Sequence, residues 1–218
     1  MNTKFEGANR LMLITHQTDT YTDYEEAELF LKGGGSWVQL RQKEGVDIEM
    51  ARRLVTLCRE KNGVLCVDDN INIALEIGAD AVHLGKNDMP VNEAWEQVRK
   101  AHRETDFLIG ATTNTFEDIQ RAASLGASYI GLGPFRFTQT KKKLSPILGL
   151  EGYRRIIEQC EEAGIHLPIY AIGGIELEDI PNLMKTGVHG IAISGSIIRA
   201  DNPVEMTRRF IEKILGEI

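Results

Sequence analysis

Short apolar segments alternate with longer amphipathic segments along the whole sequence, and this alternation limits the possible folds more than any other feature. The apolar segments have the length of strands, while the amphipathic ones carry the periodicity and capping residues of helices. We expect strands at residues 10–15, 36–41, 64–67, 80–85, 106–112, 127–133, 168–174 and 189–196. We expect helices at residues 24–34, 47–63, 71–78, 90–103, 115–126, 149–164, 176–187 and 202–218. Strict alternation of strand and helix predicts a parallel sheet.

Eight strand–helix units within 218 residues fit one parallel fold best. They predict an α/β protein made of a single (βα)8 TIM barrel domain, residues 1–218, rather than an open doubly wound sheet. The expected strands are continuous apolar runs, as in sheets that are covered on both faces. One long irregular segment, residues 134–148, interrupts the pattern, and such a loop in a compact domain is typical of ligand binding.

Composition narrows the class of protein. Hydrophobic residues make up 42% and charged residues 26%, which is enough for a large core and argues against disorder. The net charge of −7 argues against nucleic-acid partners, because a phosphate backbone requires a basic face. No segment has the length of a membrane span or the pattern of a leader, so we expect a soluble cytoplasmic protein. The three cysteines form no CxxC pair, which fits a reducing compartment, and nothing indicates the oligomeric state.

Polar and glycine residues recur at one end of nearly every expected strand. In a (βα)8 barrel the chemistry lies at the carboxyl ends of the strands, so we expect these residues to meet at one face. They are Gln39, Arg41, Lys43, Asp68, Asp69, Asn70, His83, Gly85, Lys86, Asp88, Thr112, Thr113, Asn114, Thr138, Thr140, Lys141, Gly173, Gly174, Ser194, Gly195 and Ser196.

The stretch VQLRQK predicts an anion site. A strand directs every second side chain to the same face, so Gln39, Arg41 and Lys43 are expected to lie together. Two cations this close repel each other unless an anion joins them. Asp69 and Asp88 follow the neighbouring third and fourth strands, and carboxylates beside an anion site favour a bridging Mg²⁺ ion. We therefore expect a diphosphate bound together with Mg²⁺.

Two glycine-containing stretches predict a second anion site. IGGI, residues 172–175, and ISGS, residues 193–196, follow the seventh and eighth expected strands. Loops at these two places in the barrel commonly bind one phosphate through backbone N–H groups, which glycine leaves accessible. A diphosphate on one side and a monophosphate on the other suggest two phosphorylated substrates.

Structural explanations remain open for several of these residues. The cations of VQLRQK could form ordinary salt bridges, and one of Asp68 and Asp69 is expected to cap the helix 71–78. His83 is either a core histidine or a ligand contact. Trp37 and Cys66 are expected in the core, and the structural or exposed histidines are expected to be His16, His102, His166 and His189.

Five segments together resemble the thiamine phosphate synthase family. They are VQLRQK, VDDNINIALEIGADAVHLGKND, YIGLGPFRFTQTKKKLSPILGLEG, YAIGGI and GIAISGSI, and HLGxxD and GP…TxTK…LGLE are the most specific parts. The resemblance implies a Mg²⁺-dependent (βα)8 barrel enzyme. Its substrates would be 4-amino-5-hydroxymethyl-2-methylpyrimidine diphosphate and hydroxyethylthiazole phosphate, and its products thiamine monophosphate and pyrophosphate.

The resemblance also implies roles for individual residues. Asp69 and Asp88 would be the Mg²⁺ ligands, and the catalytic residues Arg41, Lys43 and Lys141 would stabilise the departing pyrophosphate. The substrate-binding residues would be Gln39, Arg41, Lys43, Asp68, Thr112, Thr138, Thr140, Lys141, Gly174, Ser194 and Gly195.

The sequence departs from the family's usual residues in four places. Asp68 replaces an Asn, Lys86 replaces a Gln, residues 112–114 read TTN in place of Ser-x-His, and residues 194–196 read SGS in place of Val-Ser-Ala. A sister family, the thiazole tautomerases, resembles this one and uses a His after the fifth strand. Asn114 stands at that place and cannot transfer a proton. A tautomerase and a non-catalytic barrel that binds phosphorylated ligands are the alternative functions.

Overall fold

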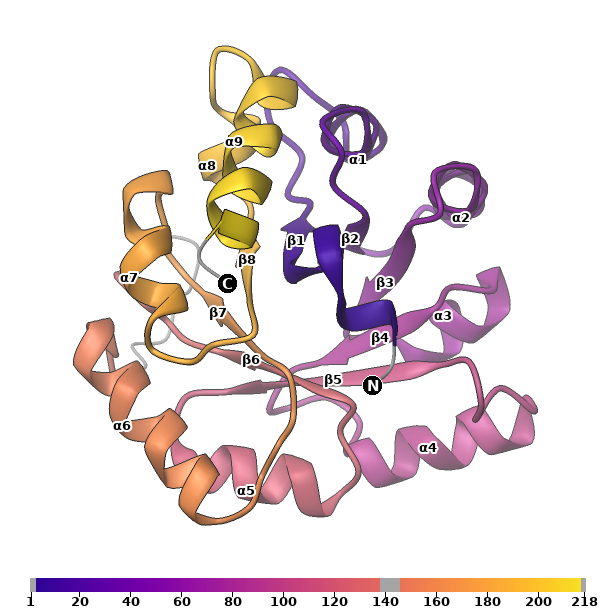
Figure 1. Cartoon of the computed structure of the whole chain (residues 1–218). Helices are drawn as coiled ribbons and strands as arrows, with labels where there is room; N and C mark the ends of the chain where they lie inside the picture. The colour runs from indigo at the N-terminus through magenta and orange to yellow at the C-terminus, as the bar shows by residue number, and fades with distance from the viewer. Residues whose placement is uncertain (1–2, 138–145, 217–218) are drawn as a thin grey trace.

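The computed structural model describes residues 3–137 and 146–216 of the chain. Its strands are parallel and form a closed barrel in sequence order, with β1 paired to both β2 and β8 (Figure 1). The strands are β1 (Leu11–Ile14), β2 (Trp37–Leu40), β3 (Val64–Asp68), β4 (Ala81–Leu84), β5 (Leu108–Thr113), β6 (Tyr129–Leu132), β7 (Ile169–Ile172) and β8 (Gly190–Ile193). The predicted (βα)8 barrel is confirmed.

Helices surround the barrel, and the last of them, α9, packs against α1, so that the ring closes (Figure 1). The helices are α1 (Asp23–Lys32), α2 (Ile48–Glu60), α3 (Ile71–Ile77), α4 (Val91–Lys100), α5 (Phe116–Ser124), α6 (Gly149–Glu162), α7 (Ile180–Met184), α8 (Gly195–Ile198) and α9 (Pro203–Gly216). Asp47 caps α2 as predicted, because its side chain accepts from the backbone N–H of Met50.

Most element boundaries differ from the prediction by a few residues, and two elements differ in kind. The expected helix 176–187 is a 3-10 turn, η3 (Leu177–Asp179), followed by the short α7, which has a proline in its first turn. The expected strand 189–196 ends at Ile193, because Ser194 leaves the extended conformation and begins the short α8. Ser-Gly-Ser favours neither a strand nor a long helix, so the neighbouring elements decide its conformation.

One end of the barrel is closed by the N-terminal segment. Two 3-10 turns, η1 (Thr3–Phe5) and η2 (Gly7–Arg10), precede β1 and therefore lie at the amino ends of the strands. The Phe5 ring stacks on Trp37 with ring centroids 5.7 Å apart, and Trp37 packs edge-on against Tyr129. Trp37 and Cys66 are both fully buried, as predicted. The strand ends opposite this aromatic cluster are left for a functional site.

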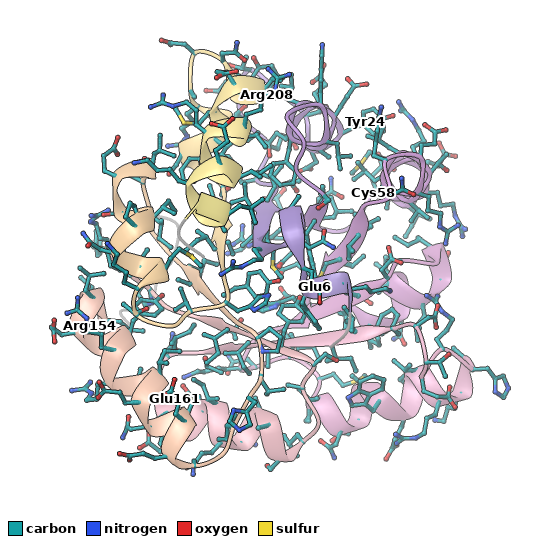
Figure 2. The ribbon with its side chains drawn as sticks, viewed as in Figure 1. Glu6, Tyr24, Cys58, Arg154, Glu161 and Arg208 are labelled. Carbon is teal, nitrogen blue, oxygen red and sulfur yellow. The ribbon has the colours of Figure 1, made fainter. Side chains whose placement is uncertain are left out.

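The helices have one apolar and one charged face. Cys58 on α2 and Cys160 on α6 are buried against the barrel, and these thiols and that of Cys66 are all free. Arg154 and Glu161 lie on the solvent side of α6 (Figure 2). Among the described helices, none is long and apolar enough to cross a membrane.

Candidate active site

Side chains from β2 and β3 meet at the open end of the barrel. Gln39 Nε2 donates to Asp68 Oδ1 at 2.6 Å, and Arg41 Nε lies 3.3 Å from Asp68 Oδ2. Because both reach the same carboxylate, Gln39 and Arg41 lie on one face, as the alternation along β2 predicts. Asp68 is thus the ion-pair partner of Arg41. Lys43 lies beyond the end of β2 and is exposed.

The carboxylates of Asp69 and Asp88 converge over Gly85. The Asp88 carboxyl is close enough to raise the pKa of Asp69, and Gly85 N–H donates to Asp88 Oδ2 at 2.6 Å. A Cβ at position 85 would lie 2.6 Å from that oxygen and 3.7 Å from Asp69 Oδ1, so only glycine leaves room there. Asp69 has a φ of 62°, a left-handed conformation that is uncommon for residues other than glycine. Such strain is concentrated at functional sites.

Two carboxyl groups of this cluster resist ionisation. Burial raises the pKa of Asp68 to about 6, although Arg41 and Gln39 act in the opposite direction. Partial burial raises the pKa of Asp69, and the neighbouring carboxyl groups of Asp68 and Asp88 raise it further. Like charges held this close favour a bound cation, which would keep the carboxyl groups ionised.

The donor set fits Mg²⁺ in one particular way. The described residues contain no group of three or more His, Cys, Asp or Glu side chains placed to hold a metal ion. Mg²⁺, however, commonly uses one or two carboxylates and takes its other ligands from waters and substrate phosphates. Asp69 and Asp88 therefore suit a magnesium site that the substrate completes.

Thr112 is held by a buried hydrogen-bonded chain. Its Oγ1 lies 3.0 Å from His83 Nε2, and His83 Nδ1 lies 3.3 Å from the hydroxyl of Tyr129. His83 is only 9% exposed and Tyr129 is fully buried. This series of hydrogen bonds thus runs from the barrel interior to the carboxyl ends of the strands, which form the mouth of the barrel. His83 is a core histidine whose outer nitrogen contacts a predicted substrate-binding residue.

The loop after β7 is fixed by the segment after β6. Arg136 N–H donates to the Gly173 carbonyl at 2.9 Å, and its guanidinium donates to the Gly174 carbonyl at 2.9 Å. The same guanidinium forms an ion pair with Asp179. Gly173 has a φ of 100°, and a Cβ there would lie 2.8 Å from the Pro134 Cβ. Arg136 was not among the predicted site residues, although it lies within GPFRF, part of a segment that resembles the family.

The loops after β7 and β8 are joined to each other and to β1. Ser196 Oγ donates to the Ile175 carbonyl at 2.7 Å. Ser194 Oγ lies 2.8 Å from Nδ1 of His16, which follows β1, and His16 lies against the buried Glu26. His16, which was expected to be structural or exposed, therefore has structural partners on α1 and at the end of β8. Ser194 is 178 positions away from His16 in the sequence, so this contact leaves no local pattern.

Three predicted site residues, Thr138, Thr140 and Lys141, lie outside the described residues. The base of their loop is described. Leu148 N–H donates to the Pro134 carbonyl at 3.0 Å, so the two ends of the loop meet beside β6 and β7.

The expected cap of α3 is wrong. Neither Asp68 nor Asp69 caps this helix; the side chain of Asn70 accepts from the backbone N–H of Ile73 at 3.1 Å. Asp68 still belongs to β3 and lies two residues before the cap position, and Asp69 has a positive φ in place of the extended backbone that an N-cap needs. The side chains of Asp68 and Asp69 therefore do not cap α3 and instead contact Gln39, Arg41 and the residues around Gly85.

Two departures from the family pattern have structural partners. Lys86 Nζ lies 2.5 Å from Asp118 Oδ2, at the start of α5. Asn114 is buried, and its side-chain amide donates to the Gly133 carbonyl, which joins the ends of β5 and β6. The Asn114 side chain thus ties two strands together where a tautomerase would need a proton-transfer group.

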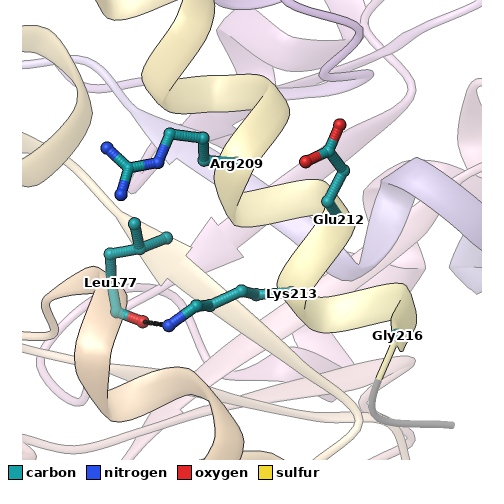
Figure 3. Close-up of a pocket in the computed structure, with 5 residues that line it drawn as sticks. All are labelled: Leu177, Arg209, Glu212, Lys213 and Gly216. Atoms are coloured by element: carbon teal, nitrogen blue, oxygen red, sulfur yellow. Dashed lines mark hydrogen bonds between the residues drawn. The ribbon is translucent and has the colours of Figure 1, made fainter.

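A separate surface pocket lies away from these residues, between η3 and α9 (Figure 3). Lys213 crosses it and donates to the Leu177 carbonyl at 3.5 Å. None of the predicted site residues lines this pocket, whose lining residues are Leu177, Arg209, Glu212, Lys213 and Gly216.

A carboxylate pair suited to a divalent cation, a cationic β2 end and glycine-containing loops after β7 and β8 share the open mouth. They define a (βα)8 barrel of the class that takes phosphorylated ligands at the carboxyl ends of its strands. The family model of thiamine monophosphate synthase matches residues 11–197. The chain belongs to the thiamine monophosphate synthase family.

Relatives at high identity agree with this assignment. The chain is 53% identical to the thiamine-phosphate synthase of Phocaeicola vulgatus, over 92% of this chain and 96% of the relative. It is 50% identical to that of Bacteroides fragilis, over 92% of this chain and 98% of the relative. Among solved structures, thiamine phosphate pyrophosphorylase from Pyrococcus furiosus is 30% identical, with a TM-score of 0.84 over 97% of this chain and 98% of that one.

These comparisons confirm the predicted enzyme of thiamine phosphate synthesis. Neither alternative function, the tautomerase or the non-catalytic barrel, has support among these relatives.

Proposed function

We propose that this chain joins 4-amino-5-hydroxymethyl-2-methylpyrimidine diphosphate to hydroxyethylthiazole phosphate within the barrel mouth. The bond between the pyrimidine methylene carbon and the diphosphate oxygen breaks, and its electron pair leaves with pyrophosphate. The lone pair of the thiazole ring nitrogen forms the new bond to that carbon. The products are thiamine monophosphate and pyrophosphate, and no protein nucleophile takes part.

The cationic residues act on the leaving group. Arg41 and Lys43 stabilise the negative charge that builds on the departing pyrophosphate, and Lys141 is proposed as a third cation. Arg41 forms its ion pair with Asp68, and a diphosphate offers the guanidinium a more highly charged partner in the same region. Gln39 and Thr112 are proposed as hydrogen-bond donors to the pyrimidine diphosphate, and Asp68 is proposed as a further residue of its binding site.

Asp69 and Asp88 are proposed as the protein ligands of Mg²⁺. The ion would neutralise charge on the diphosphate and so make pyrophosphate a better leaving group. The two residues contribute by holding their carboxylates together over Gly85, from the ends of neighbouring strands. This convergence, beside Arg41, is the observation that carries the proposal.

The thiazole phosphate is proposed to bind on the opposite side of the mouth. Gly174, Ser194 and Gly195 would surround its phosphate, together with Thr138 and Thr140 of the loop after β6. The Ser196 contact to the Ile175 carbonyl keeps the two glycine loops at a fixed distance. Binding both substrates in one mouth aligns the ring nitrogen with the methylene carbon, which lowers the entropic part of the barrier. The buried free thiols of the chain suit a reducing compartment such as the cytoplasm.

A product assay tests the proposal. Purified protein is given both substrates and Mg²⁺, and thiamine monophosphate and pyrophosphate are measured together, with Asp88→Ala and a metal-free sample as controls. We expect equimolar products that disappear in both controls. Folded wild-type protein that makes neither product would contradict the proposal. Conversion of the unaromatised thiazole phosphate alone would instead favour the tautomerase.

A further inference from the structure

Ser194 forms a cluster with His16 and Glu26, two residues to which the proposed reaction gives no role. Ser194 Oγ and His16 Nδ1 are 2.8 Å apart, and Glu26 Oε1 lies 3.6 Å from the same ring nitrogen. The other oxygen of Glu26 accepts from the His16 backbone N–H at 3.1 Å. Glu26 is fully buried, although it lies on α1, whose other glutamates are partly or fully exposed. A buried carboxylate is costly unless a partner compensates it.

The cluster contains the residue types of a hydrolytic triad but not its arrangement. In a triad, the base contacts the serine through one ring nitrogen and the carboxylate through the other. Here both neighbours lie on Nδ1, while His16 Nε2 is buried without a hydrogen-bond partner among the described residues. His16 therefore cannot pass a proton from Ser194 to Glu26. A role for the cluster would therefore be to fix the direction of the Ser194 hydroxyl hydrogen.

The Glu26 carboxylate decides where the hydrogen atoms lie. A negative oxygen 3.6 Å from Nδ1 favours the ring form that carries a proton on that nitrogen. Nδ1–H then donates to Ser194 Oγ. The hydroxyl hydrogen of Ser194 cannot point back at His16, so it is available to an acceptor elsewhere. An anion in the mouth is such an acceptor.

We propose that Glu26 and His16 are positioning residues that turn the Ser194 hydroxyl into a hydrogen-bond donor for the phosphate of the thiazole substrate. The inference rests on the proposed function, because it assigns that phosphate to the mouth beside Ser194. It deepens that function, because it makes the side chain of Ser194 a recognition element. It also gives a role to SGS, which departs from the family's usual Val-Ser-Ala.

Substitutions at His16 test the proposal by the substrate whose KM they change. His16→Ala removes the Nδ1–H donor, whereas the side-chain amide of His16→Asn can replace it. We expect His16→Ala and Ser194→Ala each to raise the KM for thiazole phosphate about tenfold, the worth of one hydrogen bond to a charged group. The KM for the pyrimidine diphosphate should change less than about twofold, and His16→Asn should recover most of the loss. His166→Ala, an exposed histidine, is the matched control.

The double variant His16→Ala, Ser194→Ala separates a positioning role from a general structural one. If His16 acts through Ser194, the double variant should be no worse than Ser194→Ala alone. Independent, additive losses would overturn the proposal, as would an equal rise of both KM values. Glu26→Gln, which keeps the side-chain size, should give an intermediate KM for thiazole phosphate.

Calorimetric titration with thiazole phosphate alone distinguishes failure of this inference from failure of the proposed function. Weaker binding to His16→Ala than to wild type would support the positioning role even if the wild type made no thiamine monophosphate. Equal binding to both proteins, in an enzyme that makes product, would overturn the positioning role and leave the proposed function intact. Thermal unfolding of each variant confirms that it is folded.

Discussion

The two ends of the barrel are built on opposite principles. At the amino end of the strands, Phe5, Trp37, Tyr129 and Tyr170 pack ring against ring and are almost completely buried. At the carboxyl end, acidic and basic side chains meet, the pKa values of Asp68 and Asp69 are raised, and Asp69 adopts a left-handed φ. The amino end stabilises the folded state, whereas the carboxyl end contains electrostatic repulsion and backbone strain that destabilise it.

This difference separates the residues that stabilise the fold from the residues that cost free energy at the functional site. Aromatic rings bury large apolar areas and add favourable ring contacts. Paired carboxylates and a positive φ cost free energy, and proteins retain such costs chiefly at functional sites. The comparison predicts that substitutions at the closed end reduce stability and spare chemistry, while substitutions at the open end do the reverse.

The largest effect is expected at the closed end. Trp37→Ala removes a fully buried ring between Phe5 and Tyr129, and we expect a loss of about 3–5 kcal/mol in the free energy of unfolding. Denaturant unfolding measures it. Activity per folded molecule should stay close to wild type. The other tryptophan, Trp95, is only partly buried, so Trp95→Ala should cost clearly less. Equal costs at both sites would break the comparison.

At the open end, Asp69→Asn and Asp88→Asn should each lower kcat/KM by about 10²–10³-fold, the usual loss when one group that stabilises transition-state charge is removed. Asn tolerates the positive φ at position 69, so the backbone can stay in place. Steady-state kinetics at saturating Mg²⁺ give the rate, and thermal unfolding should show unchanged or higher stability. The control is Asp106→Asn, at a surface site near the closed end, which should neither lower kcat/KM nor raise the stability.

The raised carboxyl pKa values predict how the stability of the metal-free protein depends on pH. Asp68 has a folded pKa of about 6 against the ordinary 3.8, so the folded state binds the proton more tightly than the unfolded state. Its contribution to stability is therefore complete below about pH 4 and is lost as the pH rises through about 6, by roughly 1–3 kcal/mol.

The wild type is compared with the double variant Asp68→Asn, Asp69→Asn over pH 4–8. The difference isolates the contribution of these two carboxyl groups, because the other ionisable groups are common to both proteins. Mg²⁺ should stabilise the wild type more at pH 8 than at pH 5, since protons and metal compete for the same carboxylates. A wild type that instead gains stability relative to the variant as the pH rises would contradict the electrostatic account of the open end.

The smallest effect is expected at Asp68→Asn. The Asn side-chain oxygen can still accept from Gln39 Nε2, but the ion pair with Arg41 is lost and the guanidinium is left for a substrate anion. We expect the KM for the pyrimidine diphosphate to fall by about two- to tenfold, because Arg41 no longer has a carboxylate that competes with the substrate. An increase in KM would contradict this prediction and would show that the negative charge of Asp68 helps to bind the substrate.

The fold could be predicted because alternation is a repeated, local signal. Eight strand–helix units each carry the pattern, so small errors at residues 176–187 or at Ser194 did not change the topology. The grouping of Gln39, Arg41 and Asp68 followed from one rule, that the strand ends of a parallel barrel share a face. Both predictions needed the order of elements and no detail of packing.

The contact between His16 and Ser194 could not be predicted in this way. The two residues are separated by 178 positions and meet only because β1 pairs with β8 when the barrel closes. The cap of α3 depended on the φ values of three consecutive polar residues, which sequence alone does not give. The roles of Thr138, Thr140 and Lys141 stay predictions, because these residues lie outside the described part of the chain.

The most direct test of the account is a calorimetric titration of pyrophosphate into the wild type and into Asp69→Asn, Asp88→Asn, each with and without Mg²⁺. The account predicts that the wild type binds pyrophosphate far more tightly when Mg²⁺ is present, and that this dependence on Mg²⁺ disappears in the double variant. Tight binding without metal, or a dependence that survives in the double variant, would contradict the claim that Asp69 and Asp88 hold the cation at the open end.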